Sequence, residues 1–444
     1  MCTPMTPTSE NAGPAPLARV RTMRLRYGLN ETVNWRGFAA GPYREQIWAR
    51  FRELDTSVVR LLAFERGAPD PVEAWEPFAA CVQAVRRVGA VPMVTFSKFC
   101  PPYDDPAAVT EFAGRCASVL ARCIRQWGGA AVRDWYWGVW QHPNSEWVSA
   151  GLTFDHYRRI YEETARAILS HLSPYLEGGR PLIGGPAADG FQPFWADWIW
   201  RFVNEIDNDL IGFASWHQFG EWREVGMWGA PADERIFQTL LLARVSEYES
   251  RAKAVGRMLR GRGILNVCGE LNAHAHHEPR VSRAYNQTAF GAAYYASALI
   301  HLMRAGADLE MLKGGTDDSG PYGLMDGSAK TTPVFAAKQL CANHVRFGDE
   351  LRFPEAPAGR GVDLVVALGE SGRRSILIVH RKDEEAVYAV DELTGGQNGL
   401  RRLLKVDRGT EGQVVAAHFD GRVDFEGYGV AVVTTEPVDA KGVS

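Results

Sequence analysis

Polar side chains follow several of the apolar, strand-like runs in this sequence, each at the point where the run ends. The residues in these positions are Asn30, Glu31, Glu65, Lys98, Gln141, His142, Asp189, His217, Glu270, Asn272 and Asp317. A charged group at the end of an apolar strand is costly to bury unless it is paired or faces a cleft. Because the carboxyl ends of parallel strands lie on one face of a barrel, these positions together predict a polar pocket there.

Glu270 is the strongest candidate for catalysis, since it directly follows Val267-Cys-Gly269 at the mouth of a predicted strand. A carboxylate can act as a nucleophile or as an acid–base catalyst. The alternative is a structural carboxylate that pairs with an arginine such as Arg60. His142 could donate or accept a proton near neutral pH in a sugar site, or be an ordinary structural histidine. We expect His217 to orient a ligand rather than to catalyse.

Other chemistry-bearing motifs are weaker. The run His274-Ala-His-His-Glu278 has metal-ligating residue types, but no matching cluster of Cys, His or Asp accompanies it. We therefore predict no metal site and no cofactor. The sequence has no Gly-x-Ser-x-Gly elbow, P-loop or His-Glu-x-x-His motif, which argues against esterases, kinases and zincins. Trp147, Trp216, Trp222 and Trp228 could line a sugar subsite, although core packing is the alternative for each.

Short β-like runs alternate with helical ones through most of the chain, which favours a parallel α/β architecture. The predicted strands are 23–30, 57–64, 91–97, 135–140, 181–185, 210–216, 263–268 and 308–313, and the predicted helices are 43–53, 71–88, 106–127, 153–172, 192–206, 233–259, 281–305 and 331–346. Eight strand–helix units in this length fit a (β/α)₈ TIM barrel. A doubly wound sheet is the rival, but Tyr27-Gly-Leu-Asn30 lacks the glycine-rich pattern of its nucleotide-binding first turn.

The pattern of predicted secondary structure changes after about residue 348. Short β-like runs at 362–368, 375–380, 386–391, 413–418 and 429–434 are separated by Gly, Asp and Asn. They predict a small antiparallel β-sandwich. We therefore expect three parts: a disordered tail over residues 1–20, the barrel over residues 21–347 and the C-terminal β-sandwich over residues 348–444.

The composition limits the partners. Of the 444 residues, 46% are apolar and 23% are charged, and the net charge is −4 without a long basic run. We therefore expect neither nucleic acid nor a membrane as a partner. The 7 cysteines are scattered, and residues 1–17 contain no apolar signal-peptide core. We expect reduced thiols and a cytoplasmic location, with leaderless export left open. The oligomeric state stays open, a homo-oligomer included.

Ten short segments, taken in order, carry a resemblance to a known family. They are Tyr27-Gly-Leu-Asn30, Val59-Arg-Leu61, Val91-Pro-Met-Val94, Trp137-Gly-Val-Trp-Gln-His-Pro-Asn144, Phe154-Asp-His-Tyr-Arg-Arg-Ile-Tyr-Glu-Glu-Thr-Ala165, Gly184-Gly-Pro186, Ser215-Trp-His217, Gly269-Glu-Leu-Asn272, Ala289-Phe-Gly-Ala-Ala-Tyr294 and Tyr322-Gly-Leu-Met325. Their order and spacing resemble glycoside hydrolase family 39, which includes β-xylosidases and α-L-iduronidases. The resemblance runs from about residue 27 to residue 340 and implies a retaining (β/α)₈ glycosidase with a C-terminal sandwich.

The resemblance also implies roles for individual residues. Glu270 falls on the nucleophile of the family, and Arg60 falls on the arginine that supports the charge of that nucleophile. His217 falls in the sugar-binding pocket, with Phe219 at a position where Tyr is usual. The resemblance therefore favours the catalytic interpretation of Glu270 over the structural one.

This sequence departs from the family at two adjacent positions. His142 stands where the acid/base Glu is expected, and Gln141 replaces the Asn that normally binds the sugar 2-hydroxyl. A retaining glycosidase needs two carboxyl groups about 5–5.5 Å apart, and losing general acid–base help costs roughly 10²–10⁴-fold. Three accounts stay open: His142 is the acid, another carboxylate such as Glu146, Glu65 or Glu221 supplies it, or ordinary glycosides are no longer hydrolysed.

We predict a glycoside hydrolase-like enzyme that acts through a retaining-type mechanism on a carbohydrate or a glycosylated small molecule. The alternatives are a catalytically disabled carbohydrate-binding barrel and a non-hydrolytic enzyme that acts on a glycosylated metabolite in a biosynthetic pathway. The predicted catalytic residues are Glu270 and His142, and the predicted substrate-binding residues are Gln141, His217, Asn272, Arg60, Trp216, Glu65 and Lys98.

Overall fold

The structure is a computed structural model that describes part of the chain. The described residues are 17, 19–30, 35–64, 70–97, 103–276, 278–316, 322–354, 361–370, 372–390 and 399–436. Two predicted substrate-binding residues, Glu65 and Lys98, lie outside the described residues. So do residues 1–16 of the predicted tail, and Glu31 and Asp317 among the polar residues at strand ends.

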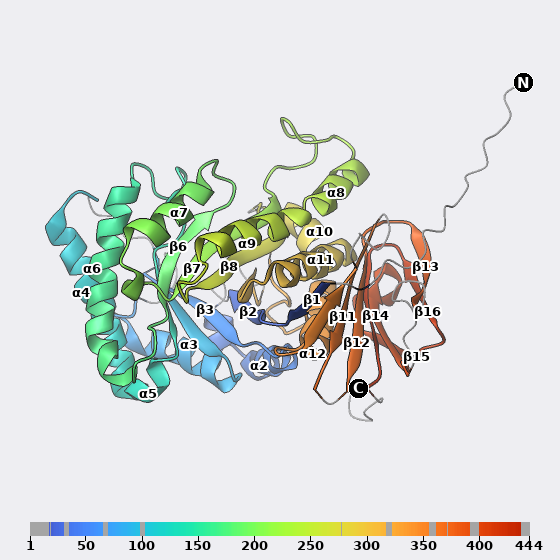
Figure 1. Cartoon of the computed structure of the whole chain (residues 1–444), viewed down its shortest axis with the longest axis horizontal. Coiled ribbons are helices and arrows are strands. Elements are labelled where there is room, and N and C mark those ends of the chain that lie inside the picture. Colours follow the sequence, from blue (N-terminus) through green and yellow to red (C-terminus); the bar gives the residue numbers. More distant parts are fainter. Residues whose placement is uncertain are drawn as a thin grey trace, which may run out of the picture.

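Eight parallel strands close into a barrel, which confirms the predicted fold class (Figure 1). These strands are β2 (Arg26–Asn30), β3 (Val58–Ala63), β4 (Val91–Phe96), β5 (Tyr136–Val139), β6 (Ile183–Asp189), β7 (Phe213–Glu221), β8 (Leu265–His274) and β9 (Leu309–Lys313). Strand β2 closes the ring by pairing with both β3 and β9. The strands are buried along most of their length, as expected of a parallel sheet that helices cover.

Helices connect the strands and cover the outside of the barrel (Figure 1). They are α1 (Trp35–Ala40), α2 (Arg44–Glu53), α3 (Trp75–Arg87), α4 (Pro106–Trp127), α5 (Gly129–Val132), α6 (Phe154–Leu172), α7 (Trp195–Glu205), α8 (Glu234–Ala243), α9 (Ser246–Met258), α10 (Pro279–Asn286), α11 (Ala289–Ala305) and α12 (Pro333–His344). Side chains of Asp105, Thr153 and Thr332 cap the first turns of α4, α6 and α12. In the described part of the chain, every helix is too short or too polar to cross a bilayer.

Two long predicted helices are each divided in the structure. The predicted helix 233–259 forms α8 and α9, and the predicted helix 281–305 forms α10 and α11. The second division has a clear local cause, because the Thr288 side chain accepts a hydrogen bond from the Gly291 backbone N–H and so starts a new helix. A period of apolar residues continued across this cap, which is why the sequence pattern alone predicted one helix.

Three predicted strands are longer than expected. The predicted strand 181–185 continues to Asp189 as β6. The predicted strand 210–216 begins at Phe213 and continues to Glu221, and the predicted strand 263–268 continues to His274 as β8. Glu270 therefore lies inside a strand rather than after it. The polar residues in the extensions of β7 and β8 are buried and have hydrogen-bond partners, so they did not end the strands as the sequence pattern suggested.

Antiparallel strands follow the barrel and form the predicted sandwich region. A seven-stranded sheet has the order β1-β10-β11-β12-β17-β14-β15, and β13 pairs with β16 in a second sheet. The bounds are β1 (Arg19–Thr22), β10 (Glu350–Phe353), β11 (Val362–Leu368), β12 (Arg374–His380), β13 (Glu385–Ala389), β14 (Arg402–Asp407), β15 (Val415–His418), β16 (Arg422–Glu426) and β17 (Gly429–Thr434). Strand β1 comes from residues that the prediction divided between the tail and the barrel.

Helices α11 and α12 lie between the barrel and the seven-stranded sheet (Figure 1). One hydrophobic cluster includes Leu299 of α11 and Leu340 of α12 together with Leu377 and Val432 of the sheet. The Ser297 hydroxyl of α11 also donates a hydrogen bond to the carboxylate of Asp363 in β11. The sheet therefore braces the last helices of the barrel.

A buried ion pair fastens α12 to the barrel strands. The Lys338 Nζ donates hydrogen bonds to Glu310 Oε1 at 2.5 Å, to the Tyr295 hydroxyl at 2.9 Å and to the Gly28 carbonyl at 2.9 Å. Both ends of the pair are fully buried. Burial lowers the pKa of Lys338 and raises the pKa of Glu310, although each charge opposes the shift of the other. The pair is therefore sensitive to the loss of either partner.

We predict that Lys338→Met lowers the free energy of unfolding by about 3–5 kcal/mol, because it leaves the Glu310 carboxyl buried without its cation. Urea unfolding measures the effect. The double variant Lys338→Met/Glu310→Leu should recover much of the loss. Arg166→Met, which removes an exposed pair with Glu162, is the control and should cost less than about 0.5 kcal/mol. Equal losses in the single and double variants would contradict the prediction.

Candidate active site

The carboxylate of Glu270 is the centre of a polar cluster at the carboxyl ends of the barrel strands. Its Oε1 accepts hydrogen bonds from Asn30 Nδ2 at 2.9 Å, Arg60 Nη1 at 3.1 Å and Gln141 Nε2 at 3.1 Å. Its Oε2 accepts from Lys313 Nζ at 3.3 Å. Only 1% of the side chain is exposed. The two oxygens therefore have different surroundings, with three donors on one and an ammonium group on the other.

Strand register brings these donors together from distant parts of the sequence. Asn30 at the end of β2 lies beside Arg60 of β3 on one side and Lys313 of β9 on the other. Gln141 comes from the loop after β5, and Glu270 lies beside His217 of β7 in the strand register. Asn30 and Lys313 are the last residues of their strands and Gln141 lies in a loop after a strand, whereas Arg60, His217 and Glu270 lie within β3, β7 and β8.

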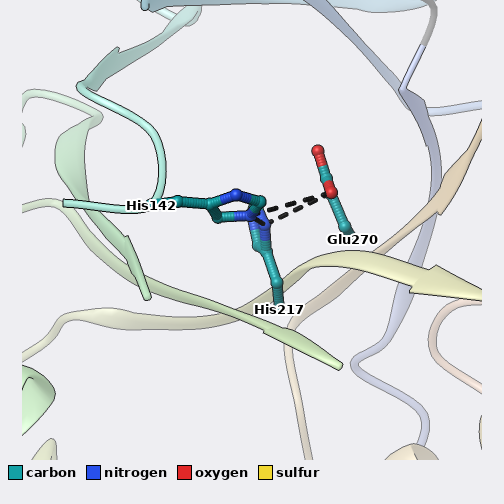
Figure 2. Close-up of side chains that lie close together, drawn as sticks. All are labelled: His142, His217 and Glu270. Atoms are coloured by element: carbon teal, nitrogen blue, oxygen red, sulfur yellow. Dashed lines mark hydrogen bonds and ion pairs between the residues drawn. The ribbon is translucent and has the colours of Figure 1, made fainter. Parts of the chain in front are cut away.

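Two histidines approach the second oxygen of Glu270 (Figure 2). His142 Nε2 lies 3.9 Å and His217 Nδ1 lies 3.4 Å from Glu270 Oε2. The same two ring nitrogens lie 2.5 Å from each other, and the rings meet edge to face. All three side chains point at one common volume, although they come from the β5 loop, β7 and β8.

The charges in the cluster follow from burial and from the neighbouring cations. Burial raises the pKa of Glu270, but the positive charge of Lys313 and the contacts of His217 outweigh it, so the pKa lies well below its ordinary value. Burial and the neighbouring His217 lower the pKa of His142 to about 3. Burial also lowers the pKa of His217. Near neutral pH the site therefore holds an ionised carboxylate and two neutral imidazoles.

The loop that carries His142 has an unusual backbone. Trp140 and His142 have φ angles of 73° and 52°, and Ala187 on the neighbouring strand β6 has φ 52°. The backbone N–H of His142 donates to the Ala187 carbonyl at 3.1 Å, and Asn144 Nδ2 donates to the Asp189 carbonyl at 3.0 Å. Left-handed conformations of non-glycine residues cost about 1–3 kcal/mol each and gather at functional sites. These contacts hold the imidazole of His142 over Glu270.

A small cavity lies inside the barrel beneath His217. Its volume of about 10 Å³ has room for about one water molecule. The cavity is lined by polar side chains of Arg60, Thr95 and Ser215 as well as by His217. Gly269 leaves this space open, because a Cβ there would lie 2.9 Å from His217 Nε2.

The structure brings together most of the predicted site residues. Arg60, Gln141, His142, His217 and Glu270 form one cluster. The convergence of strand ends suggested this for all of them except Arg60, which was expected as a partner of Glu270. The pairing of Arg60 with Glu270 is the contact that the structural interpretation of Glu270 expected, and it is equally what the family resemblance implied.

Two predicted residues and one candidate acid have other partners, and a second candidate acid is exposed. Trp216 is fully buried in the core, and its Nε1 donates to Asn266 Oδ1. Asn272 Nδ2 donates to the Lys313 carbonyl. The Glu221 carboxylate binds Arg223, and Glu146 is exposed.

Lys313 is a site residue that the sequence analysis did not name. Its signal is the two-residue period of strand β9. Leu309 and Met311 belong to the apolar layer inside the barrel, so Lys313 continues the same inward face. The ammonium group also lies over the rings of Phe219 and Tyr322, at 5.7 Å and 5.1 Å from their centres. Aromatic walls therefore hold the cation beside Glu270.

Comparison with known proteins places this geometry in a family context. The sequence model of glycosyl hydrolases family 39 matches residues 89–230. These residues include His142 and His217 but end before Glu270. A β-xylosidase of Geobacillus stearothermophilus is 31% identical over 96 residues, which are 21% of this chain and only 18% of that protein.

Solved structures of low sequence identity share the fold over nearly the whole chain. A family 39 β-xylosidase from Caulobacter crescentus is 16% identical, with a TM-score of 0.66 over 96% of this chain and 99% of that one. The family 51 α-L-arabinofuranosidase AbfB from Bifidobacterium longum is 12% identical, with a TM-score of 0.67 over 95% and 99% of the two chains. The chain is therefore similar to glycoside hydrolase family 39 in sequence over residues 89–230, from β4 to β7, and shares the fold of these glycosidases over nearly its whole length.

Proposed function

We propose that this chain is a glycosidase-like enzyme in which Glu270 attacks the anomeric carbon of a glycoside. The observation that carries the proposal is the buried carboxylate at the mouth of β8, which stays ionised because Lys313 and the His217 contacts lower its pKa. A nucleophile must be unprotonated at working pH. Arg60, Asn30 and Gln141 fix the orientation of the carboxylate through Oε1. Oε2 is then the oxygen that forms the bond to carbon.

The charge state of His142 restricts the substrate. A histidine with a pKa of about 3 is uncharged near neutral pH, so it has no proton to give to a departing alkoxide. Uncharged His142 can accept a hydrogen bond from water in the second, hydrolytic step, although a pKa of about 3 makes it a weak base. The chemistry of the first step therefore favours glycosides whose leaving group is already a stable anion, such as a glycosyl ester, phosphate or phenol.

The first prediction from the proposed function concerns the nucleophile. Incubation with a panel of 2-deoxy-2-fluoro glycosyl fluorides should add the mass of one sugar to the intact wild-type protein, because fluoride departs without an acid. Glu270→Gln should abolish the adduct. Glu221→Gln is the matched control, since Glu221 is a buried carboxylate at the end of the neighbouring strand that binds Arg223. An adduct that persists in Glu270→Gln would rule out this nucleophile. No wild-type adduct across a broad panel would favour the carbohydrate-binding alternative.

The second prediction concerns the missing acid. His142→Glu should place a second carboxyl group near Glu270, since the atoms of His142 and Glu270 are already 3.9 Å apart and retaining enzymes need about 5–5.5 Å. We expect kcat/KM for an alkyl glycoside of the sugar found above to rise by roughly 10²-fold. An activated aryl glycoside should gain much less. Equal changes for both leaving groups would mean that position 142 does not supply a proton.

The third prediction concerns pH. Because the pKa values of Glu270 and His142 both lie below the usual carboxyl range, neither group changes charge as the pH rises from about 5 to 8. The rate of adduct formation in wild type should therefore be flat across this interval, when followed by mass spectrometry at each pH. A rate that rises with a midpoint near 6.5 would show that a histidine with an ordinary pKa controls the reaction.

A further inference from the structure

We propose that His142, His217 and Glu270 form a binding site for a divalent transition-metal ion of the zinc type. Metal binding at these residues goes beyond the proposed glycosyl transfer. The two cannot occur together, because both need the Glu270 carboxylate. The side chains concerned are the three that converge in Figure 2. Of the His, Cys, Asp and Glu side chains among the described residues, these same three are the ones whose ligand atoms lie close enough together to share one ion.

The separations of the three ligand atoms fit a metal ion. His142 Nε2, His217 Nδ1 and Glu270 Oε2 form a triangle with sides of 2.5, 3.9 and 3.4 Å. The circle through these atoms has a radius of about 2.0 Å, and zinc binds imidazole nitrogen and carboxylate oxygen at about 2.0–2.2 Å. One point just outside the plane of the three atoms is therefore at bonding distance from all of them. The 2.5 Å between the two nitrogens subtends an angle of only about 75° there, so the two imidazoles must move apart to reach the tetrahedral geometry of zinc.

The residue types and their supports also suit such an ion. Two neutral imidazoles and one carboxylate are the ligand set of many three-ligand sites that keep a further position open. The carboxylate is already oriented through its other oxygen by Arg60 and Asn30. The second ring nitrogen of His217 faces the small cavity, where a water molecule can accept its hydrogen. Ligation by His217 Nδ1 therefore leaves the rest of the ring satisfied.

Lys313 opposes the ion. Its ammonium group lies 3.3 Å from the ligating oxygen, and two cations on one carboxylate oxygen repel each other. The side chain is 17% exposed, so the ammonium group must move away from Glu270 Oε2 when the ion enters. We therefore expect modest affinity in the wild type and tighter binding where Lys313 is replaced by a neutral residue.

Occupation of the site removes the nucleophile. Glu270 Oε2 cannot form a bond to an anomeric carbon while its lone pair is held by a metal ion. The ion is therefore expected to slow adduct formation without unfolding the protein. This consequence rests on the proposed function, whereas ion binding itself does not.

Isothermal titration of the purified full chain with Zn²⁺ tests the proposal. Wild type should bind about one equivalent, and His142→Asn should weaken binding by at least about tenfold, the lower end of the losses seen even for supporting groups around metals. Asn is chosen because it tolerates the left-handed backbone at this position. His276→Asn is the control, since His276 pairs with Glu224 away from the site, and it should bind like wild type. Lys313→Met should bind more tightly.

The outcomes separate the two proposals. Absence of binding in wild type, or equal binding by His142→Asn, would overturn the metal site. Binding with the expected variant pattern, but no sugar adduct without metal, would keep the metal site and remove the proposed glycosyl transfer. Adduct formation at an unchanged rate with Zn²⁺ bound would show that the ion does not use Glu270 and would also overturn the site as drawn.

Discussion

The burial of one negative charge, that of Glu270, governs the mouth of this barrel. An isolated carboxylate in so enclosed a place would be very costly. The cost is offset by donors from β2, β3, β9 and the loop after β5. Each donor depends on the register of its strand, so a shift of one strand by one residue would remove a partner and turn its side chain to the opposite face. The strand register of the barrel therefore determines whether the negative charge of Glu270 is stabilised.

The loop after β5 shows the same dependence at the level of the backbone. Its left-handed residues are tolerated because hydrogen bonds to β6 hold them in place. An unstrained exit from β5 would point position 142 in another direction. The strain is thus tied to the position of one imidazole relative to one carboxylate, which is the pattern expected where the backbone serves a ligand rather than the core.

Much of the fold could be predicted from local patterns. All eight barrel strands lie where apolar runs predicted them, because a strand buried on both faces must be apolar along its length. Strands β1, β10, β14 and β16 escaped prediction. Strands β1 and β10 are short and charged, and their pairing joins residues more than three hundred positions apart. The division of α10 from α11 depended on a single capping threonine, which an apolar period does not reveal.

Most residues of the candidate site could be predicted from the sequence, but their protonation states could not. Convergence of strand ends was enough to group Gln141, His142, His217 and Glu270, whereas Arg60 was expected as the ion-pair partner of Glu270. Lys313 was missed, although counting by twos from Leu309 places it on the inner face of β9. The neutral state of His142 follows from burial and from the second imidazole beside it. Neither the burial of His142 nor the closeness of His217 can be read from a sequence, because both depend on side chains that meet only in the folded barrel.

The unequal surroundings of the two Glu270 oxygens give the site its chemistry. Three donors already surround Oε1, so a further partner there would have to displace one of them. Oε2 faces the ammonium group of Lys313 and two imidazoles, and it is the oxygen that an incoming electrophile can reach. A sugar carbon and a metal ion would each need that same lone pair. What the site does therefore depends on which of them arrives with enough binding energy to move Lys313 aside.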